Sequence, residues 1–123
     1  TLLAGHAGYI PMADNIANGV ICTLVLCTVK DPAAAILEMK RVLKPGGKLV
    51  FIEHVAAPKK TFLRLVQDSL NPLNRLAGDG CNCNRETWNY IQRAGFKYVE
   101  LAHHKVKGPL KFHAPHIMGF AVK

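Results

Sequence analysis

One stretch of the chain holds two apolar segments with an amphipathic segment and a turn between them. Residues 20–27 are almost continuously apolar, which is typical of a strand covered on both faces and therefore placed inside a sheet. After Asp31 and Pro32, apolar side chains recur at spacings of three and four, which predicts a helix that Asp31 caps. Residues 44–47 then predict a tight turn, and residues 48–55 a second strand. The order strand, helix, strand predicts a parallel crossover and an α/β fold.

The segment after the second strand is interpreted as a lid. Residues 58–83 form an insertion between that strand and the next predicted helix. Within the insertion, Thr61 can cap a helix that runs to about Leu70, because Pro72 should end it shortly before.

The last part of the chain predicts one helix and two closing strands. Asn84 can cap a helix over residues 85–94, and Gly95 suits its left-handed end. Residues 98–103 and 117–122 then predict two strands, which we expect to pair antiparallel at the edge of the sheet.

Ligands of an open parallel sheet bind beyond the carboxyl ends of its strands. His54 ends the second strand, where an imidazole can act as a general base; the alternative is that Glu53 or His54 only anchors the lid. Asp79 lies between two glycines, whose backbone freedom can aim its carboxylate at a substrate, or it is a turn residue bonded to its own backbone. His116 begins the last strand and can reach the same mouth, although a structural role is favoured. The candidate catalytic residues are His54, Asp79 and His116.

Composition and charge argue against two classes of function. Half of the 123 residues are hydrophobic, but no apolar run approaches the roughly 20 residues needed to span a bilayer. The net charge is +8, yet Lys and Arg are scattered and not interleaved with aromatic side chains, which favours a solvated basic surface over a nucleic-acid site. Lys59, Lys60 and Arg64 lie beside apolar residues, so a short basic helix on an anionic membrane surface is the alternative to a lid helix with a solvated outer face, which we favour.

The four cysteines predict neither a disulfide framework nor a metal site. Cys22 and Cys27 fall in or beside the first predicted strand, where a free cysteine behaves as a small hydrophobe. Cys81 and Cys83 are two residues apart, and no second pair at zinc-finger spacing follows. A metal site of Cys81, Cys83 and one or two of the six histidines is the alternative. Free thiols indicate a reducing compartment, so we expect a cytoplasmic location.

Several short strings of the sequence are similar to one known family. They comprise residues 22–29, 41–47, 53–57, 71–73, 78–82, 85–87, 94–96 and 115–121. The leucine-lysine-proline-glycine-glycine turn alone identifies only a broad superfamily, whereas its combination with the Glu-His-Val-Ala-Ala and Asp-Gly-Cys strings is much more specific. Together the strings resemble the class I S-adenosylmethionine-dependent methyltransferases, in the subgroup that includes thiol methyltransferases. The likeness covers nearly the whole chain and matches the second half of such a domain.

The resemblance implies a Rossmann-like α/β fold, S-adenosylmethionine as cofactor, and methyl transfer to a small thiol or another small lipophilic acceptor. It maps the loop that contacts adenine onto His6 and Ala7, and the wall beside the methionine part onto Thr23, Leu24 and Val25. His6 stands where the family commonly has an acidic residue that accepts a hydrogen bond from the adenine amino group. A neutral imidazole can also accept that bond.

The resemblance also implies features that the sequence does not contain. The family's domain opens with a strand, a glycine-rich turn and a second strand with an acidic end, and none of these is found in residues 1–123. We therefore expect a partial methyltransferase domain over residues 1–123, with weak or no catalysis alone and an exposed apolar sheet edge prone to self-association. The alternative is a noncatalytic remnant that acts as a partner- or membrane-binding module. In a longer parent, the cytosolic face of an intracellular membrane is a second location, because the resembled subgroup commonly has a membrane-associating amino-terminal segment.

Overall fold

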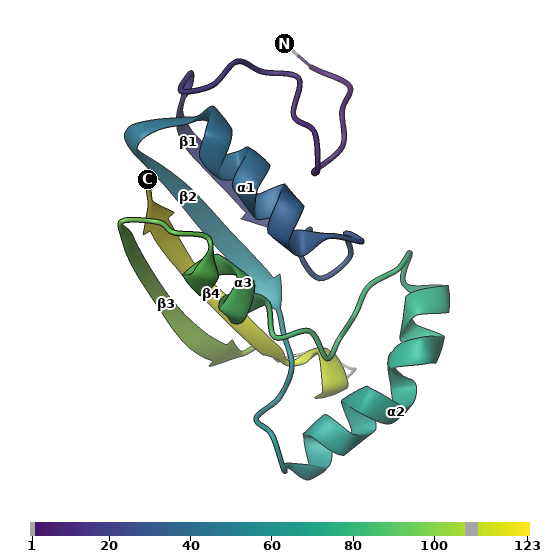
Figure 1. Ribbon diagram of the computed structural model, residues 1–123. Coiled ribbons are helices and arrows are strands. Elements are labelled where there is room, and N and C mark those ends of the chain that lie inside the picture. Colours follow the sequence, from purple (N-terminus) through teal and green to yellow (C-terminus); the bar gives the residue numbers. More distant parts are fainter. Residues whose placement is uncertain (1, 108–110) are drawn as a thin grey trace.

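The structure, a computed structural model, describes residues 2–107 and 111–123. In chain order its elements are β1 (Ala17–Thr23), α1 (Pro32–Val42), β2 (Leu43–His54), α2 (Phe62–Ala77), α3 (Thr87–Arg93), β3 (Tyr98–Lys105), η1 (Lys111–His113) and β4 (Pro115–Val122). The strands form one sheet in the order β1-β2-β4-β3, in which β1 and β2 are parallel and β4 is antiparallel to both neighbours. Helices α1 and α3 lie on one face of the sheet, and α2 projects beyond one end of it (Figure 1).

The predicted crossover is confirmed as β1, α1 and β2. Asp31 Oδ1 accepts a hydrogen bond from Ala34 N (2.9 Å), and Pro32 takes the first helical position, so both start signals act as expected. Gly46 has a φ of +79°, which glycine adopts without strain, as the predicted turn requires. One difference is that β2 begins at Leu43, ahead of this turn, where its pairing with β1 is irregular.

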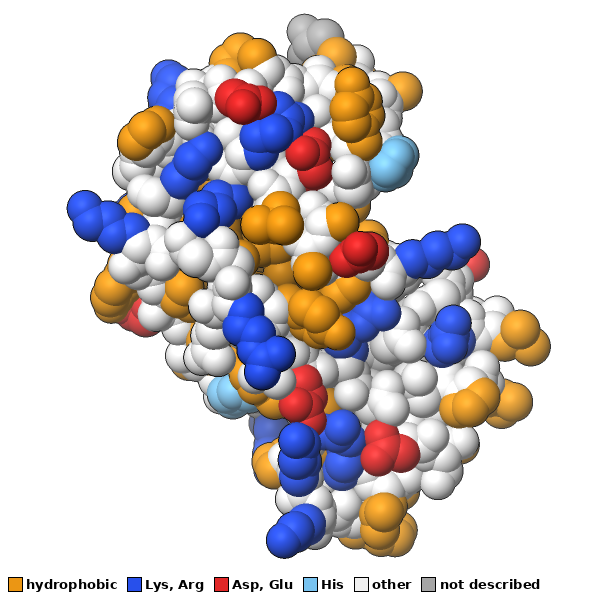
Figure 2. Space-filling view, in the orientation of Figure 1, with side chains coloured by type: hydrophobic (Ala, Val, Ile, Leu, Met, Phe, Trp, Pro, Cys, Tyr) orange, Lys and Arg blue, Asp and Glu red, His pale blue; other side chains and the backbone are white. Residues whose placement is uncertain are grey.

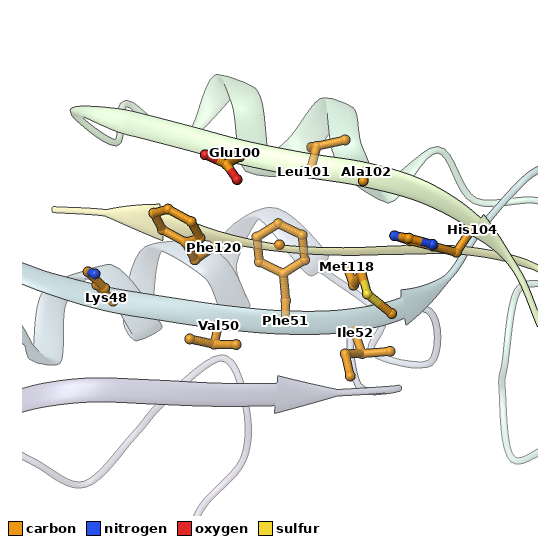
Figure 3. Close-up of a pocket in the computed structure, with 11 residues that line it drawn as sticks. Lys48, Val50, Phe51, Ile52, Glu100, Leu101, Ala102, His104, Met118 and Phe120 are labelled. Atoms are coloured by element: carbon orange, nitrogen blue, oxygen red, sulfur yellow. The ribbon is translucent and has the colours of Figure 1, made fainter.

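The hydrophobic core lies between the two covering helices and one face of the sheet. Its buried side chains include Ile36, Met39, Leu49, Phe51, Ile91, Ile117 and Ala121. Because side chains alternate along a strand, Val50 and Ile52 of β2 point to the opposite face and are 43% and 39% exposed. Figure 3 shows these side chains with others of β3 and β4 around an open hollow of about 730 Å³ on the sheet. The helices of the described ranges leave this face uncovered.

Strand β1 differs from its prediction in both length and place. It ends at Thr23 and does not continue to Cys27, because the backbone N–H groups of residues 25–27 bond the side chain of Glu53. Among the described strands it pairs with β2 alone, and Ile21 is 81% exposed. The expectation of a strand inside the sheet is therefore wrong here. A continuous apolar run is suited to contacts on both faces, but the described part of the chain supplies them on one.

Helix α2 runs through the residue that was expected to end it. Thr61 Oγ1 accepts a hydrogen bond from Arg64 N (3.2 Å), which confirms the predicted cap, but Pro72 lies inside the helix. Pro72 has no N–H to bond the carbonyl of Asp68, four residues earlier. Asp68 is exposed, so water can bond that carbonyl. Figure 1 shows that α2 bends along its length, as a proline within a helix produces.

Helix α3 begins later than expected. Its N-cap is Glu86, and Asn84 Nδ2 instead donates a hydrogen bond to Asp68 Oδ1 (2.8 Å). The predicted Asn84 cap is therefore wrong, because its amide joins this segment to α2. Gly95, with a φ of +72°, follows the helix as predicted. Strands β3 and β4 pair antiparallel, as expected, with β3 at the sheet edge.

One face of the molecule shows how the basic side chains are distributed on it. Lys and Arg side chains are spread across the visible face rather than gathered in one patch (Figure 2). Apolar side chains also protrude there, over the region that α2 occupies in Figure 1. Within residues 2–107 and 111–123, no helix has both the length and the apolar character needed to cross a membrane.

Candidate active site

The side chain of Glu53 fixes the loop that follows β1. It is fully buried; its Oε1 accepts hydrogen bonds from Val25 N (2.9 Å) and Leu26 N (3.0 Å), and its Oε2 accepts one from Cys27 N (3.2 Å). Cys22 Sγ also donates to Oε1 (3.3 Å). Burial and the neighbouring Glu53 carboxylate raise the pKa of the Cys22 thiol, which keeps it a donor. The buried side chain of Glu53 thus holds this loop at the carboxyl ends of the parallel strands, where the sequence predicted a binding site.

The same loop holds Leu24 in a strained backbone conformation. Its φ is +54°, in the left-handed region that leucine rarely adopts. The backbone N of Leu24 donates to Ile52 O (2.9 Å), and the bonds to Glu53 follow directly in the chain. These contacts fix the strained residue, and its side chain remains about half exposed.

A cavity of about 260 Å³ opens beside this loop. Its lining residues are Leu24, Cys27, Thr28, His54, Cys81, His113 and His116. His54, at the end of β2, pairs across the sheet with His116 at the start of β4, and their ring centroids lie 6.0 Å apart. The structure therefore brings together two of the three predicted catalytic residues. Their catalytic roles stay predictions.

Two cysteines complete the cluster around His54. Cys81 Sγ lies 3.0 Å from His54 Nε2, and the ligand atoms of Cys27, His54 and Cys81 all lie within 4.8 Å of one another. The hydrogen bond from the Cys27 thiol lowers the pKa of Cys81 to about 7. The same hydrogen bond, together with burial, raises the pKa of Cys27. Cys81 is therefore the more readily ionised thiol of the pair.

Cys81 is positioned by the segment that follows α2. Asn74 Nδ2 donates to Cys81 O (2.8 Å), and Asn82 N donates to Cys27 O (2.9 Å), so the segment is bonded to α2 and to the loop after β1. Asp79 in the same segment is exposed, has a φ of +49° and is not among the residues that line the cavity. The structure does not bring it to His54, and its catalytic role stays a prediction.

The sequence did not predict Cys27 as a site residue. It also did not predict that His113 lies beside His54, where the two ring centroids are 5.1 Å apart. It grouped Cys81 with Cys83, but the buried Cys83 thiol donates to a carbonyl of α2 and does not line the cavity. A usable signal was present, because Cys27 follows one parallel strand and His54 ends the next, and such ends meet at one edge of a sheet.

A second hollow, of about 420 Å³, lies in the amino-terminal loop and is lined by Leu3, Gly5, His6, Ala7, Ile10, Pro11 and Met12. The exposed ring of His6 lies 6.3 Å from that of Tyr9. Helix α1 holds the loop: Ile10 N donates to Glu38 Oε2 (2.9 Å), and Arg41 Nη2 donates to Ile10 O (2.9 Å). A hydrogen bond from Arg41 lowers the pKa of Glu38 to about 2.

Known proteins similar to this chain carry methyltransferase names. The family model described as "Methyltransferase domain" matches residues 1–51. The human protein "Thiol S-methyltransferase TMT1A" is 44% identical over 114 residues, which cover 91% of this chain and 46% of that protein. The rat protein "Thiol S-methyltransferase TMT1B" is 46% identical over 114 residues, with the same two shares. These likenesses in sequence and fold support a class I S-adenosylmethionine-dependent methyltransferase. The chain is thiol methyltransferase-like, and it spans about half the length of the curated relatives it matches.

Solved methyltransferase structures share the fold of this chain. A SAM-dependent methyltransferase from Thermotoga maritima has a TM-score of 0.70 at 20% identity, covering 98% of this chain and 63% of that one. A protein from Bacillus halodurans, titled a putative methyltransferase, has a TM-score of 0.71 at 16% identity, covering 97% of this chain and 69% of that one. The expected Rossmann-like α/β methyltransferase sheet is confirmed.

The likeness to these methyltransferases implies S-adenosylmethionine as cofactor. The hollow beside His6 and Ala7 fits the adenine end, since it combines apolar walls with an imidazole that can accept a hydrogen bond when neutral. In the part of the chain that the structure describes, no acidic side chain lines this hollow. Thr23 and Leu24 are exposed and Val25 is half-buried. The loop that Glu53 holds therefore offers a surface for the methionine part of the cofactor. These five residues are the ones that would hold the cofactor, and this mapping stays a prediction.

Proposed function

We propose that this chain forms the acceptor-binding part of a methyltransferase that transfers a methyl group from S-adenosylmethionine to a small thiol. The observation that carries the proposal is the cavity of about 260 Å³ at the carboxyl end of β2, where His54 meets two thiols and His116. The printed names of the human and rat relatives supply the acceptor class. A cavity of this size suits a small acceptor rather than a macromolecule.

The roles of the residues follow from the chemistry of thiols. A thiolate is a far better nucleophile than a thiol, so the acceptor must lose its proton. His54 lines the cavity and takes that proton as a general base. Leu24 contributes an apolar wall, and the bonds to Glu53 fix the loop that aligns the acceptor. Bound S-adenosylmethionine supplies a methyl group on a sulfonium that already contains a good leaving group.

The test is formation of a methyl thioether from a small aliphatic thiol, followed by mass spectrometry. We expect His54→Asn to lower the rate by about 100-fold or more, because general-base catalysis contributes a factor of that order. His104→Asn is the matched control, since His104 is an exposed histidine of β3 outside the cavity lining. An equal loss in both variants, or none in His54→Asn, would contradict the proposed role.

We also propose that this chain alone transfers methyl groups weakly, with support from the lack of an acidic side chain among the described residues that line the hollow beside His6. Calorimetric titration with S-adenosylhomocysteine is therefore made on this chain and on a fusion that places the first half of rat TMT1B before it. Tight binding by the fusion alone supports the proposal. Binding by neither protein contradicts the cofactor assignment, and equally tight binding by both contradicts the weakness of the chain alone.

A second candidate function is that of a membrane-binding module, and a specific feature of α2 favours it. Phe62, Leu65, Leu73 and Leu76 recur at helical spacing and are 81%, 63%, 71% and 87% exposed. Lys59 and Lys60, just before the helix, are exposed as well. An exposed apolar stripe with adjacent lysines is the pattern of a helix that lies in the surface of an anionic membrane.

This candidate is tested by sedimentation with vesicles of anionic or zwitterionic lipid. We expect binding to the anionic vesicles that weakens with salt, and loss of binding in the double variant Leu73→Ser and Leu76→Ser. Leu37→Ser on α1 is the control, since Leu37 is 54% exposed but lies on another helix. If neither kind of vesicle binds at low salt, the exposed stripe is not a membrane surface.

A further inference from the structure

The cluster around His54 has the donor set and spacing of a metal site. The ligand atoms of Cys27, His54 and Cys81 lie within 4.8 Å of one another. In a tetrahedral zinc site, thiolate and imidazole ligand atoms lie about 3.5–3.8 Å apart, so small side-chain rotations suffice. Two thiolates and an imidazole are soft ligands, which prefer zinc to magnesium or calcium.

The three ligands come from three segments that are each fixed independently. Cys27 lies on the loop that Glu53 holds, His54 ends β2 within the sheet, and Cys81 is bonded to α2 through Asn74. Cys27 and His54 are almost completely buried, and Cys81 is half-buried. The framework therefore holds the three groups together without help from an exposed side chain.

All three candidate ligands line the same cavity. Within residues 2–107 and 111–123, the only group of three or more metal-ligating side chains at this spacing is Cys27, His54 and Cys81. His113 and His116 line the same cavity but bond elsewhere, to Asn74 Oδ1 (2.7 Å) and to a backbone carbonyl. Three protein ligands and one open position is the arrangement of catalytic zinc sites, whereas structural sites have four protein ligands.

We propose that Cys27, His54 and Cys81 bind one zinc ion, and that its open position takes the sulfur of the acceptor thiol. The second half of this proposal rests on the proposed function. When zinc binds, the S–H bonds of Cys27 and Cys81 break, two zinc–sulfur bonds form and both protons pass to solvent. When the acceptor coordinates, its S–H bond breaks, a third zinc–sulfur bond forms at the open position and its proton passes to solvent. In this arrangement His54 is a metal ligand in place of the general base proposed above, and the metal lowers the pKa of the acceptor thiol.

The metal site is tested without cofactor or acceptor, on metal-free chain kept reduced with a phosphine. We expect one Co²⁺ ion to bind with a thiolate charge-transfer band and the visible spectrum of a tetrahedral centre, and Zn²⁺ to displace it. Cys81→Ser should lower the affinity at least about 100-fold, since even partners of metal ligands contribute 10–100-fold. Cys83→Ser is the matched control, being a cysteine outside the cluster.

Two outcomes would overturn the site. One is the absence of a thiolate band at stoichiometric Co²⁺, and the other is a band that Cys81→Ser leaves unchanged while circular dichroism shows the variant folded. The open position is tested by adding a small aliphatic thiol to the Co²⁺ form, which should strengthen the charge-transfer band. An unchanged spectrum would overturn the thiol step alone. The Co²⁺ titration does not depend on methyl transfer. Failure of the proposed function would therefore not overturn the metal site, and failure of the metal site would not overturn the proposed function.

Discussion

The cavity beside His54 and the hollow beside His6 are both candidate binding regions, but different kinds of contact hold them. Around His54 the structural contacts are buried: Glu53 and Gln67 are fully buried and bond backbone groups of neighbouring segments. Around His6 they are surface contacts, made by Glu38 and Arg41 at the side of α1. Buried polar contacts are costly to break, whereas surface ion pairs contribute little and are sensitive to pH and salt. The proposed acceptor side is therefore the more rigid of the two, and the proposed adenine side is the more adaptable.

The largest expected effect is that of removing the Glu53 carboxylate. Glu53→Ala removes the hydrogen-bond partner of the N–H groups of Val25, Leu26 and Cys27, of which the last two are buried. We expect a loss of about 3 kcal/mol or more in the free energy of unfolding, measured by urea denaturation. Glu38→Ala is the control, and its smaller loss would sharpen the comparison. Equal losses would show that the two regions are equally dependent on their carboxylates.

A smaller but still large effect is expected at Gln67. Its Oε1 accepts a hydrogen bond from Ala57 N (2.6 Å), and its Nε2 donates to Val55 O (3.2 Å) and Phe112 O (2.8 Å). Gln67→Leu keeps the volume and removes these bonds, so we expect a loss of about 2–3 kcal/mol in thermal or urea unfolding. Gln92→Leu, at an exposed position, should change stability within about 0.5 kcal/mol. If Gln67→Leu leaves the free energy of unfolding unchanged, the hydrogen bonds of Gln67 do not stabilise the fold around the cavity.

The stability contributed at the hollow beside His6, the proposed adenine side, should respond to acid. Arg41 holds the pKa of Glu38 at about 2, below its ordinary value of 4.5, so ionised Glu38 stabilises the fold above pH 4.5. That contribution is lost as the pH falls from 4.5 toward 2. We expect Glu38→Gln to be less stable than the parent at pH 6 and the difference to shrink across this window, as measured by urea midpoints. A difference that is constant with pH would rule out the ionised pair as its cause.

The smallest effect is expected at His6. Its side chain is exposed, so His6→Ala should change the unfolding free energy by no more than about 0.5 kcal/mol. His6→Asp restores the acidic character common at this place in the resembled family, and we expect S-adenosylhomocysteine to bind several-fold more tightly in calorimetry. His103→Asp on β3 is the matched control. If His6→Asp leaves the affinity for S-adenosylhomocysteine unchanged, the result argues against this hollow as the adenine site.

Local signals in the sequence predicted the fold well where the determining contacts are also local. The Asp31 cap, the turn at Gly46 and the helix stop at Gly95 each depend on a few neighbouring residues, and all three are found in the structure. The predicted end of α2 at Pro72 was wrong because the missing hydrogen bond falls on an exposed part of the helix. Asn84 did not cap α3 because its amide bonds Asp68 of another helix.

The candidate site was only partly predictable, since its contacts join distant parts of the chain. His54 and His116 were found because each lies at a strand end, and the topology places those ends together. The role of Glu53 depends on backbone groups 26 to 28 residues earlier. Cys27 and Cys81 meet only after α2 and the following segment fold back. The spacing of the two cysteines along the sequence does not indicate that contact.

The strand order has a consequence for how the chain reaches its fold. β4 follows β3 in the chain, yet it lies between β2 and β3 in the sheet. Until residues 115–122 leave the ribosome, β3 has no neighbour in this sheet and His116 cannot reach His54. Contacts so distant in sequence slow folding, because a long loop must close before they form. During translation, the carboxyl-terminal residues therefore determine when the sheet and its cavity assemble.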